Sequence, residues 1–155
     1  MVNKLLELLE PTAVFLDLEV TDSRAVIQKL GDSLYEAGYV RETFVGAALA
    51  REEQLPTGLP LGGEINAAIP HTDVEHVKKP GLAMATLARP VVFQNMVDIG
   101  ESVQVRLVFL LSLDQPKAQI EMLQEIAGVL QNSEVVSRLI EAKTYEDVCK
   151  SLSSV

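Results

Sequence analysis

Hydrophobic and polar residues alternate along residues 13–20, AVFLDLEV, with the period of a half-buried strand. The glycine-rich residues 58–63 predict a tight turn or a close approach of two backbones. Arg89 and Pro90 are expected to lie in a loop or at a sheet edge. Further apolar runs predict strands at residues 65–69, 82–87 and 103–113. The last of these is long and apolar enough to be central in a sheet.

Between these strands, apolar residues recur every three or four positions, as they do in helices packed on one face. Thr21 or Asp22 is expected to cap a helix that ends near Gly38. A second helix is expected from Glu42 to Gln54. The last third of the chain predicts three more helices. Pro116 is expected in the first turn of one, and Ser133 and Thr144 are expected as the N-cap residues of the other two.

Strands that alternate with helices predict an α/β fold, with a mixed β-sheet of about five strands flanked by helices. A chain of 155 residues, 48% of them hydrophobic, can bury one substantial core. Since no repeat or linker divides the sequence, residues 1–155 are expected to form a single layered domain.

Charge and composition exclude several functions. A net charge of −9 argues against a nucleic-acid partner, because few cations are available to replace counterions. The longest apolar run, residues 107–113, is too short to span a bilayer, so no direct membrane insertion is expected. The first ten residues are too acidic and too short for a signal peptide. The lone Cys149 suits a reducing compartment, and we expect a cytoplasmic protein.

His71 is the most informative side chain. Pro70 restricts the backbone and must end the preceding strand, so that His71 stands at a strand end. Thr72 and Asp73 can each cap a following helical turn, whose free N–H groups would favour an anion beside the ring. Neutral imidazole has a free lone pair near pH 7 and is an established covalent nucleophile. This setting favours nucleophilic attack on phosphorus.

A small metal-dependent hydrolase that uses His71, Asp73 and His76 is an alternative from another class. The sequence has only two histidines, and it lacks both an H-E-x-x-H motif and a cysteine pair. It also lacks the G-x-S-x-G of serine hydrolases and the nucleotide-binding P-loop. His76, five residues after His71, is expected to face away from it as a satisfied surface residue.

Three segments together carry a family resemblance: AREEQLPTGL (50–59), INAAIPHTDVEHV (65–77) and the helical residues 120–148. With them the chain resembles, over residues 11–152, the enzyme IIA component (EIIA) of the bacterial phosphoenolpyruvate-dependent sugar phosphotransferase system. Within the fructose/mannitol-type superfamily it is most similar to galactitol-specific members. The resemblance implies a phosphotransferase component that needs no cofactor and no metal. A regulatory member of the same superfamily is the other alternative.

In such a protein, His71 would accept a phosphoryl group on Nε2 from the phosphocarrier protein HPr. It would pass the group to a cysteine of the EIIB component, and the membrane component EIIC would carry the sugar. Both protein partners must reach His71, so the surrounding surface is expected to have an apolar rim. Candidate residues for this rim are Leu59, Leu61, Met84 and Met96.

The resemblance also implies roles for three more residues. Arg51, in the R-E motif, would contact the phosphoryl oxygens, whereas composition alone would pair it with Glu52 or another acid of its helix. Thr72 would either donate a hydrogen bond to phosphate or cap the turn. Gln119 stands near the start of a helix where other members carry a second active-site histidine. An amide there can donate a hydrogen bond but cannot carry positive charge.

Overall fold

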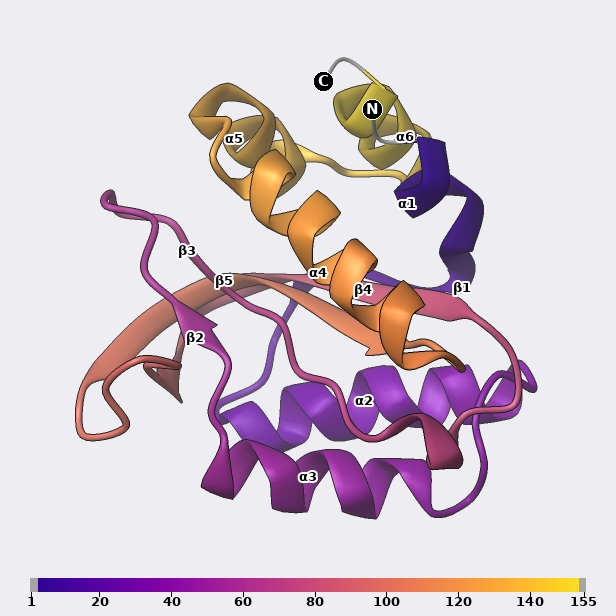
Figure 1. Ribbon diagram of the computed structural model, residues 1–155. Helices are drawn as coiled ribbons and strands as arrows, with labels where there is room; N and C mark the ends of the chain where they lie inside the picture. Colours follow the sequence, from indigo (N-terminus) through magenta and orange to yellow (C-terminus); the bar gives the residue numbers. More distant parts are fainter. Residues whose placement is uncertain (1–2, 154–155) are drawn as a thin grey trace.

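The computed structural model describes residues 3–153 and contains one five-stranded sheet with helices on both faces (Figure 1). The strand order is β1-β4-β5-β3-β2. The strands are β1 (Leu9–Leu18), β2 (Gly58–Leu59), β3 (Asn66–Ala68), β4 (Gly81–Gln94) and β5 (Ser102–Ser112). β1 and β4 are parallel, as are β3 and β5, whereas the other two pairs are antiparallel. The predicted α/β fold with a mixed sheet is confirmed. The predicted domain limits, residues 1 and 155, lie outside the described residues.

The helices divide between the two faces of the sheet (Figure 1). One face is covered by α2 (Ser23–Glu36) and α3 (Phe44–Gln54). The other is covered by α1 (Asn3–Leu8), α4 (Pro116–Leu130), α5 (Ser133–Glu141) and α6 (Tyr145–Ser153). A short 3₁₀ turn, η1 (Val74–His76), follows β3. No helix within residues 3–153 has the length and apolar character needed to cross a membrane.

β5 lies in the middle of the sheet and separates two hydrophobic cores. Leu107, Phe109 and Leu111 pack toward α4, α5 and α6, whereas Val108 and Leu110 pack toward α2 and α3. Because side chains of a strand alternate between faces, a nearly continuous apolar run can supply both cores. The prediction that residues 103–113 form a central strand is confirmed.

Several element limits differ from the sequence-based expectations. β1 begins at Leu9, and β4 continues through Arg89 and Pro90 to Gln94. The β4–β5 register shifts between Thr86 and Val91, so Pro90 lies at an irregularity where the ladder does not need its missing N–H. The helix α1 and the two-residue strand β2 were not expected, because segments this short carry almost no periodic pattern.

Side-chain caps explain where three of the helices begin. Asp22 caps α2 by accepting a hydrogen bond from the Ala25 amide, as predicted. The predicted cap Ser133 is wrong, because the Asn132 side chain accepts from the Val135 amide and makes Ser133 the first helical residue. Thr144 caps the last helix as predicted, since its hydroxyl accepts from the Asp147 amide at 3.1 Å.

Gly58 allows the backbones of β2 and β4 to approach closely. A Cβ atom at this position would lie 2.5 Å from the carbonyl oxygen of Gln94, which is rigid backbone. We therefore expect Gly58→Ala to lower the free energy of unfolding by about 1–3 kcal/mol, measured by urea denaturation. Gly63→Ala is the matched control, because a Cβ there would meet no atom within 4 Å. Equal urea midpoints for the two variants would contradict the close-approach interpretation.

Candidate functional site

The backbone on both sides of Pro70 is held by neighbouring segments. The Ile69 amide donates to the Thr57 carbonyl at 3.3 Å, and the Leu111 amide donates to the Pro70 carbonyl at 3.2 Å. β3 ends at Ala68, one residue before the predicted strand end at Ile69, and Pro70 follows outside the strand as expected. His71 therefore follows directly from a strand end that is tied to β5 on one side and to the residue before β2 on the other.

The His71 ring is half-buried, and one of its nitrogens is engaged. Its Nδ1 lies 2.9 Å from the Ile69 carbonyl oxygen, which can only accept a hydrogen bond. Nδ1 must therefore carry the proton, which leaves the lone pair on Nε2 in the neutral ring. Burial lowers the pKa of His71 below its usual 6.5; Arg51 lowers it further, whereas the Ile69 carbonyl and Asp73 oppose the shift. The ring is thus a neutral nucleophile at pH 7.

Arg51 lies in the last turn of α3 and reaches the segment that follows His71. Its Nη1 is 3.3 Å from Oδ1 of Asp73, and its side chain is 31% exposed. Its Nε is buried and has no hydrogen-bond partner among residues 3–153. The alternative in which Arg51 pairs with an acid of its own helix is wrong, because its ion-pair partner is Asp73. An unpaired buried donor beside His71 is available for an anion.

Glu52, the next residue, points to a different partner. Its carboxylate accepts hydrogen bonds from the Thr57 amide at 2.9 Å and from the Thr57 hydroxyl at 2.8 Å. Burial raises the pKa of Glu52 to about 6, although the two bonds from Thr57 oppose this shift. From the sequence, Glu52 was expected only as a partner for Arg51. The T-G pair in the segment AREEQLPTGL was the sequence signal that could have indicated Thr57 as the partner of Glu52.

The raised pKa of Glu52 predicts a pH-dependent effect of Glu52→Gln. A carboxyl with a pKa of 4.5 unfolded and about 6 folded adds stability below pH 4.5, and this contribution is lost as the pH rises through 6. Above that value the charged form costs on the order of 2 kcal/mol, which an amide avoids. We expect the variant to gain about 1–2 kcal/mol at pH 8 and almost nothing at pH 4.5, measured by urea denaturation. A loss of stability at pH 8 would contradict this.

Thr72 does not cap the turn that follows His71, so this part of the prediction is wrong. The N-cap position of η1 belongs to Asp73, which separates Thr72 from the turn and makes no side-chain cap bond. Thr72 itself is buried, with 4% of its surface exposed. The turn forms as predicted, but a single 3₁₀ turn has too small a dipole to attract an anion strongly. The nearby cation is Arg51.

Gln119 lies in the first turn of α4, near the predicted helix start. Its Oε1 is buried without a hydrogen-bond partner in the described part of the chain. No hydrogen bond joins it to His71 or Arg51 within residues 3–153. Its role at the site stays a prediction.

His76 faces another partner, as expected from its spacing. Its Nδ1 lies 2.8 Å from the hydroxyl oxygen of Thr43. Across residues 3–153, no three His, Cys, Asp or Glu side chains are grouped so that they could hold a metal ion. The metal-dependent hydrolase therefore lacks the ligand cluster of His71, Asp73 and His76 that it requires.

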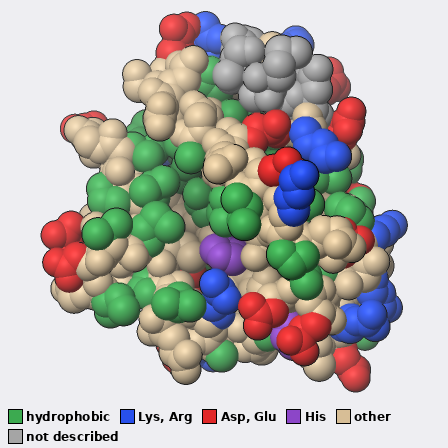
Figure 2. All heavy atoms as spheres, viewed as in Figure 1, with side chains coloured by type: hydrophobic (Ala, Val, Ile, Leu, Met, Phe, Trp, Pro, Cys, Tyr) green, Lys and Arg blue, Asp and Glu red, His purple; other side chains and the backbone are tan. Residues whose placement is uncertain are grey.

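The molecular surface is consistent with contact between proteins. Figure 2 shows a histidine in the middle of one face, with hydrophobic side chains around it and cationic and acidic groups beside it. Among the predicted rim residues, Met96 is 44% exposed, and Leu59 and Leu61 are half-buried. Met84 is wrong as a rim residue, because it is fully buried in the core.

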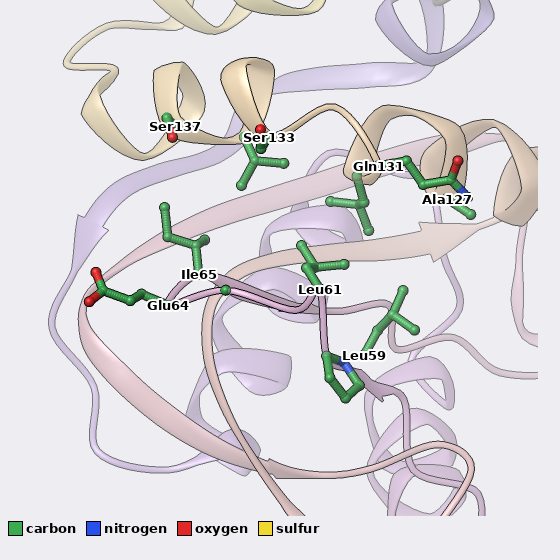
Figure 3. Close-up of a pocket in the computed structure, with 12 residues that line it drawn as sticks. Leu59, Leu61, Glu64, Ile65, Ala127, Gln131, Ser133 and Ser137 are labelled. Atoms are coloured by element: carbon green, nitrogen blue, oxygen red, sulfur yellow. The ribbon is translucent and has the colours of Figure 1, made fainter.

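A groove of about 650 Å³ lies between residues 59–65 and the facing parts of α4 and α5. Leu61 and Ile65 extend toward the helices across it, whereas the Glu64 carboxylate lies at its edge (Figure 3). Neither His71 nor Arg51 lines this groove. The half-buried His71 ring therefore lies outside this groove.

Comparison with known proteins agrees with this geometry. The family model "Phosphoenolpyruvate-dependent sugar phosphotransferase system, EIIA 2" matches residues 7–155. The chain belongs to this family. The galactitol-specific EIIA component of Escherichia coli (strain K12) is 32% identical to this EIIA protein over 124 residues, which cover 79% of this chain and 81% of that protein. The mannitol-specific enzyme IIA component of Staphylococcus aureus (strain Mu50 / ATCC 700699) is 28% identical over 145 residues, 92% of each chain.

Among solved structures, enzyme IIAMTL in its complex with phosphorylated enzyme IIBMTL from Escherichia coli superimposes with a TM-score of 0.78. Sequence identity to that structure is 24%, and the match covers 95% of this chain and 98% of that chain. The predicted resemblance to EIIA proteins is confirmed. In this EIIA protein the fold brings Arg51, His71 and Asp73 together. The approach of Arg51 to His71 was expected, whereas the ion pair between Arg51 and Asp73 was not.

Proposed function

We propose that this EIIA protein carries a phosphoryl group on Nε2 of His71. The observation that supports this most is the bond from His71 Nδ1 to the Ile69 carbonyl, which leaves the Nε2 lone pair free. The depressed pKa of His71 adds to it, because the ring stays unprotonated at physiological pH. The nucleophile needs no separate base to remove a proton before it attacks.

The reaction consists of two transfers. In the first, the Nε2 lone pair of His71 attacks phosphorus of phosphohistidine on HPr, and the N–P bond to HPr breaks as its imidazole leaves with the electron pair. In the second, a cysteine thiolate of EIIB attacks the same phosphorus, and the bond to His71 breaks. The phosphoryl group is conserved and each imidazole is regenerated. Both steps pass through a loose transition state with charge on three oxygens.

Arg51 is the proposed stabiliser of that charge. Its unpaired Nε–H is a preorganised donor, and its guanidinium can bond two oxygens at once. The Thr72 hydroxyl and the Gln119 amide are proposed as neutral donors to the same oxygens. No part of this scheme requires a metal or a cofactor, because the donor is a phosphohistidine.

The proposed pathway serves uptake of a polyol, with galactitol as the first candidate. The 32% identity to a galactitol-specific EIIA component over 79% of the chain supports this choice. We further propose that residues 1–155 act as one domain in the cytoplasm, with HPr as donor and EIIB as acceptor. Sugar binding itself would belong to the membrane component EIIC and not to EIIA.

The test combines phosphorylation with onward transfer. The purified protein is incubated with phosphoenolpyruvate, enzyme I and HPr, and its peptides are analysed by mass spectrometry under alkaline conditions. We expect one phosphate, on His71, which then moves faster to a galactitol-type EIIB than to a mannitol-type EIIB.

Two results would overturn parts of this proposal. A protein without phosphate on His71 would refute the carrier function. Phosphorylation of His71 without transfer to either EIIB would favour the regulatory alternative instead.

A further inference from the structure

Four hydrogen bonds connect the Glu52 carboxylate to the His71 ring. Glu52 accepts from the amide and the hydroxyl of Thr57 at 2.9 and 2.8 Å. The Thr57 carbonyl accepts from the Ile69 amide at 3.3 Å, and the Ile69 carbonyl accepts from His71 Nδ1 at 2.9 Å. The chain of contacts thus begins on α3, crosses to the residue before β2, and ends on the reactive imidazole.

We propose that Glu52 is a positioning residue for His71. Its carboxylate fixes Thr57, Thr57 fixes the Ile69 peptide, and the Ile69 carbonyl keeps the imidazole proton on Nδ1. The consequence for phosphoryl transfer rests on the proposed function, whereas the effect on the ring does not. Glu52 does not touch the reacting atoms.

The position of the imidazole proton decides whether the ring can react. A neutral imidazole carries its proton on either nitrogen, and only the nitrogen without it has a lone pair. If the Ile69 carbonyl moved away, nothing at Nδ1 would favour the reactive form, and a proton on Nε2 would remove the nucleophile. Nδ1 itself lies against the Ile69 backbone, so it could not replace Nε2.

Thr57 lies outside the regular helices and strands. It follows Pro56, which has no N–H, and it precedes a strand of only two residues, Gly58–Leu59. Thr57 is nevertheless almost fully buried, with 3% of its surface exposed. A carboxylate that accepts hydrogen bonds from both the amide and the hydroxyl of one residue restricts the position of that residue more than a single hydrogen bond would.

No ion pair explains why the charged Glu52 carboxylate is buried. No salt bridge to Glu52 occurs among the described residues, where the ion pairs on this part of α3 belong to Arg51 and Glu53. Burial of an unpaired carboxylate opposes folding. A group that opposes folding and holds the backbone behind the reactive ring fits a positioning role.

The test compares Glu52→Ala and Glu52→Gln with Glu53→Ala, a control on an exposed acid of the same helix turn. Ring nitrogens of ¹⁵N-histidine-labelled protein are observed at pH 8 by long-range ¹H–¹⁵N spectra, without any phosphoryl donor. We expect the Nδ1–H form in the parent and in Glu53→Ala, and a shift toward Nε2–H in Glu52→Ala. Glu52→Gln should restore the parent spectrum, because its amide can accept from the Thr57 amide and donate to the Thr57 hydroxyl.

Transfer rates give the second measurement. At saturating phospho-HPr, Glu52→Ala should accept phosphate roughly tenfold more slowly, with unchanged affinity for HPr and recovery in Glu52→Gln. If Glu52→Ala does not fold, Thr57→Ala removes only the hydroxyl bond and should show a smaller shift of the same sign.

A parent-like ring spectrum in the folded variant would overturn the positioning role. A parent protein that never takes up phosphate would instead refute the proposed function, and a tautomer shift in Glu52→Ala would then still stand.

Discussion

Replacing His71 with alanine is expected to abolish phosphate acceptance from HPr. The substitution removes the Nε2 lone pair, which is the free one in the ring since Nδ1 is bonded to the Ile69 carbonyl. Stability should change by only about 1 kcal/mol, because one side-chain hydrogen bond is lost from a half-buried position. The measurement is incorporation of phosphate from labelled phosphoenolpyruvate in the presence of enzyme I and HPr.

His76→Ala is the matched control for this prediction. His76 is the second of the two histidines in the sequence, and its Nδ1 lies against the Thr43 hydroxyl. We expect this variant to accept phosphate at the parent rate. If His71→Ala still took up phosphate and His76→Ala did not, the roles assigned to the two histidines would be reversed.

Arg51→Lys should lower the maximal rate of transfer about 100-fold while HPr binds as before. Lysine keeps the positive charge but loses the Nε–H donor, which is buried and has no partner among residues 3–153 of the parent. Removing one preorganised donor from a developing negative charge typically costs a factor of this size. Rapid-quench measurement at saturating phospho-HPr separates the rate from the affinity.

Two further variants separate phosphate contact from the ion pair. Asp73→Asn removes the negative charge that lies 3.3 Å from Arg51 but keeps the guanidinium, so its rate should fall much less than that of Arg51→Lys. It should also lower the pKa of His71, because Asp73 raises it. Arg24→Lys changes an exposed ion pair with Glu53 and should have no effect on the rate of transfer. Equal rates for Arg51→Lys and the parent would exclude Arg51 as a phosphate contact.

Local patterns predicted the long elements of the fold well. The apolar residues of 103–113 and the helical spacing after Asp22 report directly which side of an element is buried. Prediction failed where no such pattern exists, as in the two-residue strand β2. The predicted strand 82–87 also ended too early, because a register shift lets β4 continue through Pro90, a residue that a regular ladder would reject.

The sequence by itself determined the family and singled out His71 as the proposed reactive group. Pro70 ends a strand before His71, and the R-E, T-G and P-H-T segments identify an EIIA protein. Tertiary structure alone decided that Arg51 pairs with Asp73, that Glu52 holds Thr57, and that the Ile69 carbonyl selects the His71 tautomer. Periodicity reports only the burial of neighbouring positions, whereas these contacts depend on how α3 and the strand ends meet across the folded chain.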